Sequence, residues 1–191
     1  MTFEEFRAKV RAEPIQRILQ KYIFGSTPIC FGGDIDLDIK LKLKISDFWG
    51  IHPKNLEIVG SAKTGFSLNP DRLGKPFNSQ SDIDIIVVSN KLFDQAWREL
   101  LQLDFKWYKL SQGEQAELQS AYATVHRGFI SPDRLPKKTV VCTDWWKQFN
   151  MLSNDSEFGL RKIRGRLFKS WWFAEKYYTQ TVLEIQKMEK K

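Results

Sequence analysis

A short apolar run rich in β-branched residues, SDIDIIVVS at residues 81–89, constrains the fold more than any other stretch of the chain. Such a run is typical of a buried β-strand. A second apolar run, NLEIVGS at residues 55–61, ends in a glycine turn and also predicts a strand. Residues 63–80 between them contain Gly, Pro, Asn and Asp, which predict a long loop.

Helical patterns dominate the rest of the chain. Thr2 is the expected N-cap of the first helix, and Pro14 fits the first turn of the second. Asn90 is the expected cap of the helix that follows the strand at residues 81–89. The expected helices cover residues 2–10, 15–22, 90–103, 111–128, 143–149 and about 158–178.

Residues 34–49 fit two patterns. Apolar and polar residues alternate strictly over residues 35–45, which is a strand pattern. Apolar residues also recur at helical spacing over residues 37–49, and Asp34 is placed to cap such a helix. Both interpretations stay open at this point.

These elements predict one domain of the mixed α/β (α+β) class over residues 1–191. Its small mixed β-sheet, to which TVVC at residues 139–142 adds a third strand, is expected to have helices on both flanks. The flanks are an N-terminal helical region at residues 1–50 and a basic C-terminal helix region at about residues 151–191. A length of 191 residues suits one domain, and 42% hydrophobic residues indicate a globular protein.

The positive charge is concentrated near the C-terminus. Residues 161–191 hold nine Lys and Arg against three Glu, a net charge of +6, which leaves +1 of the total +7 for residues 1–160. The basic stretch could meet a phosphate or a nucleic acid, or it could be a solvated helix side. The near-neutral remainder argues against a general nucleic-acid-binding module.

The sequence predicts a cytoplasmic protein without a membrane partner. No apolar run approaches the length that a bilayer requires, and MTFEEFRAKVRAE is too charged for a signal peptide. Cys30 and Cys142 form neither a CxxC pair nor a disulfide framework, which fits a reducing compartment.

Asp82 and Asp84 carry the clearest chemical signal. Two residues apart within a strand, they place both carboxylates on the same face. Adjacent carboxylates repel each other unless a cation lies between them, and a hard divalent cation such as Mg²⁺ removes that cost. The alternative is that both side chains simply face water at the end of a strand.

The glycine turn before the loop does not form a P-loop. Gly60 and Gly65 have the separation that the P-loop motif requires, but Phe66 stands where that motif has lysine. Residues 67–74 contain Pro and Gly, so no helix can directly follow to receive a phosphate.

The combination of both motifs resembles the DNA polymerase β-like nucleotidyltransferase superfamily. The resemblance rests on Val59-Gly60-Ser61 and on Ser81-Asp82-Ile83-Asp84-Ile85. It implies a minimal nucleotidyltransferase fold in which Asp82 and Asp84 are catalytic and ligate two Mg²⁺ (or Mn²⁺) ions, while Gly60 and Ser61 hold the phosphates of an incoming nucleotide. GSAKTG also looks like the branch of the bacterial second-messenger synthases, which implies that Lys63 and Thr64 border the triphosphate.

Two departures from the family pattern concern catalysis. The loop between the motifs is longer than usual, and catalytic members have a third carboxylate on a later strand. Asp144 after TVVC is the candidate for that carboxylate, although it fits a helix cap equally well. Asp133 is interpreted as a turn residue.

The expected function is Mg²⁺-dependent transfer of a nucleoside monophosphate from an NTP such as ATP to a hydroxyl. The acceptor could be an RNA end, a protein side chain or another nucleotide. The alternative is a weakly active or inactive subunit that regulates a partner, as in toxin–antitoxin or antiviral (phage-defence) systems. Residues assigned to weaker roles are Arg161, Lys162 and Arg166 at a triphosphate or RNA, His126 at a phosphate or in an ordinary loop, and SWWFAEKYY at bases or in the core.

Overall fold

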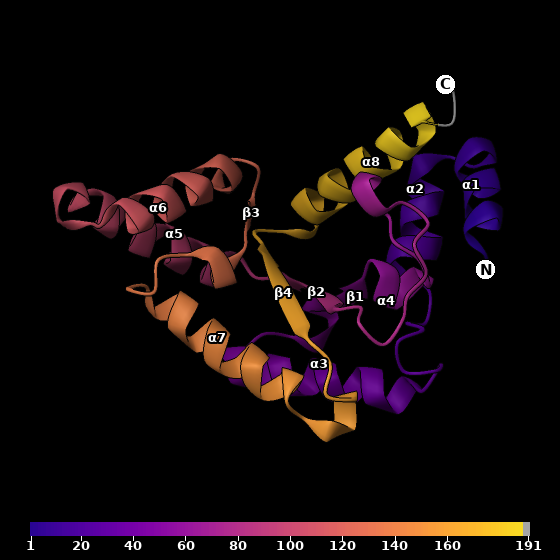
Figure 1. The fold of residues 1–191 in the computed structure, drawn as a ribbon, viewed down its shortest axis with the longest axis horizontal. Coiled ribbons are helices and arrows are strands. Elements are labelled where there is room, and N and C mark those ends of the chain that lie inside the picture. The colour runs from indigo at the N-terminus through magenta and orange to yellow at the C-terminus, as the bar shows by residue number, and fades with distance from the viewer. Residues whose placement is uncertain (189–191) are drawn as a thin grey trace.

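Four strands form one mixed β-sheet in the computed structural model, which describes residues 1–188 (Figure 1). The strands lie in the order β1-β2-β4-β3, with β1 antiparallel to β2, β2 parallel to β4 and β3 antiparallel to β4. Their bounds are Leu56–Val59 for β1, Ile83–Val88 for β2, Phe129–Ile130 for β3 and Ile163–Phe168 for β4. The mixed α/β class is therefore confirmed, as are the two strands expected from the apolar runs.

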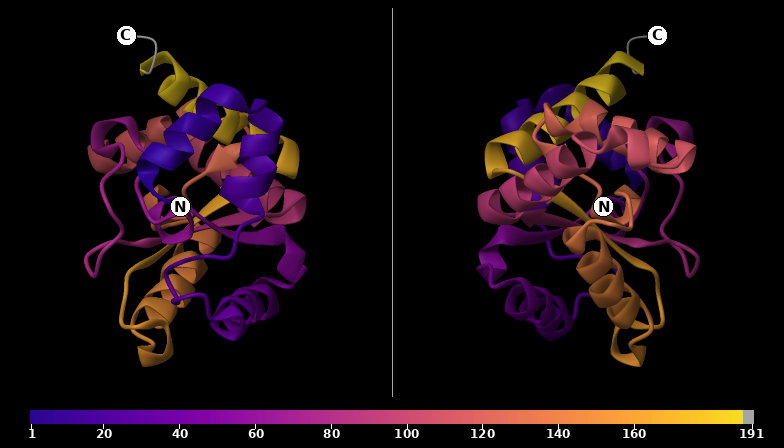
Figure 2. Two further views of the ribbon diagram at one scale, coloured as in Figure 1. Left: turned by 90° about the vertical axis from the view of Figure 1, so that its right-hand side faces the viewer. Right: turned by 90° about the vertical axis from the view of Figure 1, so that its left-hand side faces the viewer.

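Helices cover both faces of the sheet. Figure 2 shows α1, α2 and α8 on one side and α3 and α7 on the other. Their bounds are Phe3–Ala12 for α1, Ile15–Ile18 for α2 with a π-helical turn to Phe24, Ile35–Trp49 for α3, Ser61–Thr64 for α4, Asn90–Asp104 for α5, Gln112–Val125 for α6, Val140–Ser153 for α7 and Trp171–Met188 for α8. None of these helices within residues 1–188 has the length and apolar character needed to cross a bilayer.

Local capping explains several boundaries. Thr2 and Glu5 form a capping box at α1, as expected for Thr2. The cap of α5 is Ser89, whose hydroxyl accepts from the Leu92 N–H at 3.2 Å, rather than Asn90. Residues 35–49 are helical because Asp34 accepts hydrogen bonds from the first turn of α3.

Two predictions about the second half of the chain are wrong. TVVC is not a strand, because the Thr139 hydroxyl caps α7 by accepting from the Cys142 N–H at 3.3 Å. The expected single helix over residues 158–178 is instead β4 followed by α8. In β4 the buried residues alternate with the arginines, which is the two-residue period of a strand. The segment forms a strand because it pairs with β2. The expected C-terminal region extends to residue 191, and residues 189–191 lie outside the described chain.

The alternation along β2 divides the core into two clusters. Ile83, Ile85 and Val87 face the cluster beneath α3, α5 and α7, whereas Ile86 and Val88 face the cluster beneath α1 and α8. Asp84 shares the face of Ile86 and Val88 but lies nearer the beginning of β2. A cavity occupies that part of the face.

Candidate functional site

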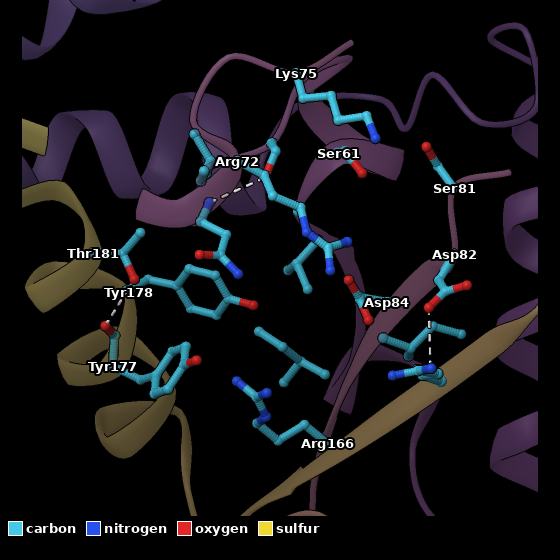
Figure 3. Close-up of a pocket in the computed structure, with 18 of the residues that line it drawn as sticks. Ser61, Arg72, Lys75, Ser81, Asp82, Asp84, Arg166, Tyr177, Tyr178 and Thr181 are labelled. Carbon is cyan, nitrogen blue, oxygen red and sulfur yellow. Dashed lines mark hydrogen bonds and ion pairs between the residues drawn. The ribbon is translucent and has the colours of Figure 1, made fainter. Parts of the chain in front are cut away.

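A cavity of about 600 Å³ lies where β1 ends and β2 begins (Figure 3). Four parts of the chain surround it: the turn after β1, the loop before β2, the β2–β4 pair, and α8 with the turn after β3. Its polar lining includes Gly60, Ser61, Arg72, Lys75, Ser81, Asp82, Asp84, Asp133, Arg134, Arg164, Arg166, Tyr177, Tyr178, Thr181 and Glu184. The structure thus brings Gly60 and Ser61 together with Asp82 and Asp84.

Gly60 lines this cavity with an unusual backbone conformation. Its φ of 64° and ψ of −149° belong to a backbone region that is essentially restricted to glycine. A Cβ at this position would lie 3.4 Å from Oδ2 of Asp84. Glycine therefore allows the turn after β1 to pass close to the carboxylate, and Ser61 follows directly with its side chain at the cavity.

Gly60→Ala is expected to lower the free energy of unfolding by about 1–3 kcal/mol, the usual cost of an L-residue in such a conformation. Thermal or urea denaturation measures the change. Gly113→Ala in α6 is the matched control, because Gly113 has no positive φ and nothing lies within 4 Å of an added Cβ. A Gly60→Ala protein as stable as the natural chain would contradict the assigned backbone strain.

Asp82 and Asp84 have different surroundings. Oδ2 of Asp82 lies 3.0 Å from Nε of Arg164, in an ion pair whose side chains are 32% and 40% exposed. The angle of this contact is poor for a hydrogen bond, since the Arg164 Nε is buried without a hydrogen-bond partner among the described residues. Asp84 instead is exposed, and its side chain faces the cavity.

The protein around the cleft raises the pKa of the Asp84 carboxyl by shielding it from bulk water. The positive charge of Arg166 opposes this shift, and the negative charges of Asp82 and Asp133 add to it. The side chain remains exposed within the cavity, so water there screens part of these charges. Asp84 therefore ionises less readily than an ordinary surface aspartate.

The strand beside β2 carries arginines where the family resemblance implies a further carboxylate. In the parallel register Asp84 lies opposite Arg164, and Ile86 lies opposite Arg166. Arg164 and Arg166 therefore share the face of Asp84 and line the cavity. Asp144 lies in α7 and does not line it.

Asp133 is the third aspartate of the cavity. It lies in the helical turn Pro132–Arg134 after β3, so it is a turn residue as expected, but its side chain also lines the cavity. Within residues 1–188 no three Asp, Glu, His or Cys side chains come close enough to hold one metal ion together. The structure therefore brings Asp133 to the same cavity without forming a three-carboxylate cluster.

Lys63 and Thr64 lie outside the cavity. The Lys63 side chain is 2% exposed, forms an ion pair with Glu57 and donates to the Phe24 carbonyl at 3.1 Å. The Thr64 hydroxyl lies 2.7 Å from the Phe66 carbonyl oxygen. Both residues stabilise the turn that carries Ser61, and neither borders the space available to a ligand.

Known proteins provide no further guide. No family model, no curated protein and no solved structure matches the chain. Support for a function therefore comes from the motifs and from the geometry of the cavity.

Several cavity residues were not apparent from the sequence. Arg72 and Lys75 belong to the loop before β2, which two backbone hydrogen bonds hold: Ser67 N–H to the Lys75 carbonyl and Gly74 N–H to the Ser67 carbonyl, both 2.9 Å. Arg72 points into the cavity (Figure 3). The only sign of these two residues in the sequence was that basic residues occur within a stretch rich in turn-forming residues.

Two tyrosines of α8 form the opposite wall. Tyr177 and Tyr178 project toward Asp84 and Arg166 (Figure 3), and the guanidinium carbon of Arg166 lies 4.8 Å from the centroid of the Tyr177 ring. Burial raises the pKa of Tyr178, so its hydroxyl stays protonated at neutral pH. Of the weaker assignments, Arg166 and these tyrosines line the cavity, whereas Arg161, Lys162 and His126 do not.

Asp82 and Asp84 are the carboxylates of β2 and its start that would hold a divalent cation in the cavity. Mg²⁺ is commonly held by one or two carboxylates together with substrate phosphate oxygens, and Asp84 is open to such an ion. Asp82 becomes available if Arg164 turns away, which costs little because partly exposed ion pairs contribute about 1 kcal/mol or less. The described residues do not supply the third carboxylate of a two-metal site.

Proposed function

We propose that the chain is a nucleotidyltransferase that binds a nucleoside triphosphate with Mg²⁺ in this cavity and transfers its nucleotidyl group to a hydroxyl. The observation that carries the proposal is the convergence of the Gly60–Ser61 turn with Asp82 and Asp84 on one cavity wall. A volume of about 600 Å³ lies within the range of small-molecule sites.

The cavity walls supply complementary charge for a triphosphate. Arg72 and Lys75 lie on the loop side, close in sequence to the turn that carries Ser61. Their positive charges would balance the terminal phosphates, and the Ser61 hydroxyl would donate a hydrogen bond to a phosphate oxygen. Tyr177 and Tyr178 offer aromatic surface to the base.

Asp82 and Asp84 would hold Mg²⁺, which when bound neutralises the charge that develops on the phosphate oxygens. The chain's own contribution is to fix these two carboxylates beside the phosphate-binding turn, so that positioning supplies much of the rate. Asp133 is the remaining aspartate of the cavity, and its carboxylate would accept the proton of the attacking hydroxyl.

A second candidate function is favoured by the ion pair between Asp82 and Arg164. If Arg164 stays in place, the cavity binds a nucleotide but holds a metal poorly, and transfer is weak or absent. The chain would then be a nucleotide-binding subunit that regulates a partner, as a component of a toxin–antitoxin or phage-defence system would.

Binding and transfer assays with each α-labelled NTP test both candidates. The protein is incubated with Mg²⁺, Mn²⁺ or EDTA, with itself, RNA or a nucleotide as acceptor. Equilibrium dialysis measures binding, and gel or thin-layer separation measures transferred label. Metal-dependent transfer is expected from the first candidate, and binding without transfer from the second.

An Arg164→Gln variant separates the two candidates further. Transfer by this variant but not by the natural chain would show that Arg164 blocks the metal. If neither protein binds any NTP, both functions are wrong.

A further inference from the structure

A second cavity, of about 320 Å³, lies beside the candidate site between α6 and α8. These two helices lie on either side of β3 and the end of β4 (Figure 1). The cavity is lined by residues of α6, of β3 and the turn after it, of β4 and of α8, among them Thr124, Arg127, Arg134, Arg166, Gln180 and Glu184. Polar side chains from both helices thus face a space that the first cavity does not include.

The two cavities share a wall. Six residues line both of them, from the turn after β3, from β4 and from α8. The shared residues are Ser131, Arg134, Arg166, Tyr177, Thr181 and Glu184. Asp133 lies between two of them in sequence and lines the first cavity. A molecule in the second cavity would therefore lie next to a nucleotide in the first, on the side of Asp133.

The charge of the second cavity is positive. Three guanidinium groups, those of Arg127, Arg134 and Arg166, line it together with one carboxylate, that of Glu184. No carboxylate within residues 1–188 forms an ion pair with Arg127 or Arg134. Positive charges that lie close together repel one another, and an anionic ligand between them would relieve that repulsion.

An aromatic ring holds two of these guanidinium groups in place. The guanidinium carbons of Arg127 and Arg166 lie 5.6 Å and 5.5 Å from the centroid of the Phe129 ring. Phe129 is buried and belongs to β3, so the platform is part of the sheet. Stacking on a ring leaves the N–H edges of a guanidinium free to donate to phosphate oxygens.

We propose that the second cavity is the acceptor site of the proposed nucleotidyltransferase, and that it binds the phosphates at an RNA end. This inference rests on the proposed function and specifies the acceptor. A serine or tyrosine side chain of a protein carries no phosphate, so it would gain nothing from three guanidinium groups. A ribonucleotide supplies both the anion and a hydroxyl that can reach the first cavity.

The reaction then follows from the arrangement of both ligands. The acceptor hydroxyl oxygen forms a bond to the α-phosphorus of the NTP, and the bond from that phosphorus to the bridging oxygen breaks. Pyrophosphate leaves with the electron pair of the broken bond, and the hydroxyl proton passes to the Asp133 carboxylate.

Binding of a fluorescein-labelled oligoribonucleotide tests the proposal without relying on transfer. Arg127→Gln/Arg134→Gln is expected to weaken binding about tenfold or more, because hydrogen bonds between charged groups are lost. The slope of log affinity against log salt concentration should fall by about one for each arginine that contacts a phosphate. Arg98→Gln on α5 is the matched control, since Arg98 is exposed and lines neither cavity.

The outcomes separate this inference from the proposed function. If NTP binds but the oligoribonucleotide does not bind, or binds equally to the natural chain and to Arg127→Gln/Arg134→Gln, the acceptor site is wrong and the proposed function stands. Transfer of label to a protein acceptor in preference to RNA would also overturn the acceptor assignment. Loss of oligoribonucleotide binding in Arg98→Gln to the same degree would show general charge attraction and overturn it too. If no NTP binds while Arg127→Gln/Arg134→Gln still weakens oligoribonucleotide binding, the proposed function fails and the assignment as an acceptor site fails with it.

Discussion

Replacing Asp82 and Asp84 together by asparagine is expected to reduce nucleotidyl transfer by about 100-fold or more, the scale of losing a group that stabilises transition-state charge. Asparagine keeps the size of both side chains but removes the two negative charges that would hold Mg²⁺ beside the Gly60–Ser61 turn. The initial rate of label transfer at saturating NTP and Mg²⁺ measures the effect.

Asp144→Asn is the matched control for this double variant. Asp144 lies in α7 and outside the cavity, so its replacement should leave the rate of transfer unchanged. Equal loss of transfer in Asp144→Asn would mean that the chain adopts a different arrangement in which Asp144 is the missing third carboxylate.

The melting temperature of Asp84→Asn shows whether a loss of transfer comes from lost chemistry or from unfolding. The pKa of Asp84 is raised in the folded protein, so its ionised form opposes folding at pH values above the unfolded pKa. Asp84→Asn removes that charge and should raise the melting temperature at pH 7 rather than lower it. The difference should vanish as the pH falls below the unfolded pKa, where the natural side chain is protonated in both states. A lower melting temperature at pH 7 would mean that the rate loss reports unfolding.

Gly165→Ala is expected to destabilise the protein by about 1–3 kcal/mol, the usual cost of overpacking a core. A Cβ at Gly165 would lie 2.4 Å from Cζ2 of Trp145 and 2.5 Å from Cζ of Phe149, so at least one ring must move. Both rings belong to the core cluster under α7 and stack on each other with centroids 4.7 Å apart. For a domain of this size, the melting temperature should fall by about 2–4 °C for each kcal/mol.

A second substitution checks the cause of this effect. Phe149→Leu removes part of the ring that the new Cβ would meet. In the presence of Gly165→Ala, Phe149→Leu should cost less than it does alone, a coupling that a double-mutant cycle measures. Additive costs in the cycle would show that the clash is not the source of the instability.

Much of the fold was predictable because local chemistry and tertiary structure agree there. The β-branched runs of β1 and β2 and the capped helices α1, α5 and α6 follow directly from their patterns. The segment at residues 139–142 has strand-forming residues, but the Thr139 cap starts a helix instead. The apolar residues of β4 fit both the period of a helix and that of a strand. Pairing with the edge of β2 selects the strand, and a local sequence pattern contains no information about that pairing.

The same difference between local and distant information limits prediction of the site. Asp82, Asp84, Gly60 and Ser61 were identifiable because two short motifs carry them. The position of the Lys63 side chain could not be foreseen, because the short helix α4 directs it toward Glu57. Arg164 could not be assigned to the site until β4 was known to be a strand parallel to β2.

Gly165 lies between the two site arginines in β4. On one side of β4 the rings of Trp145 and Phe149 approach the backbone directly, because no Cβ separates them from it. On the other side Arg164 and Arg166 project into the cavity. At this point only the backbone of β4 separates the aromatic core from the polar cleft. A change in the packing of α7 would therefore act directly on the backbone segment that carries both arginines.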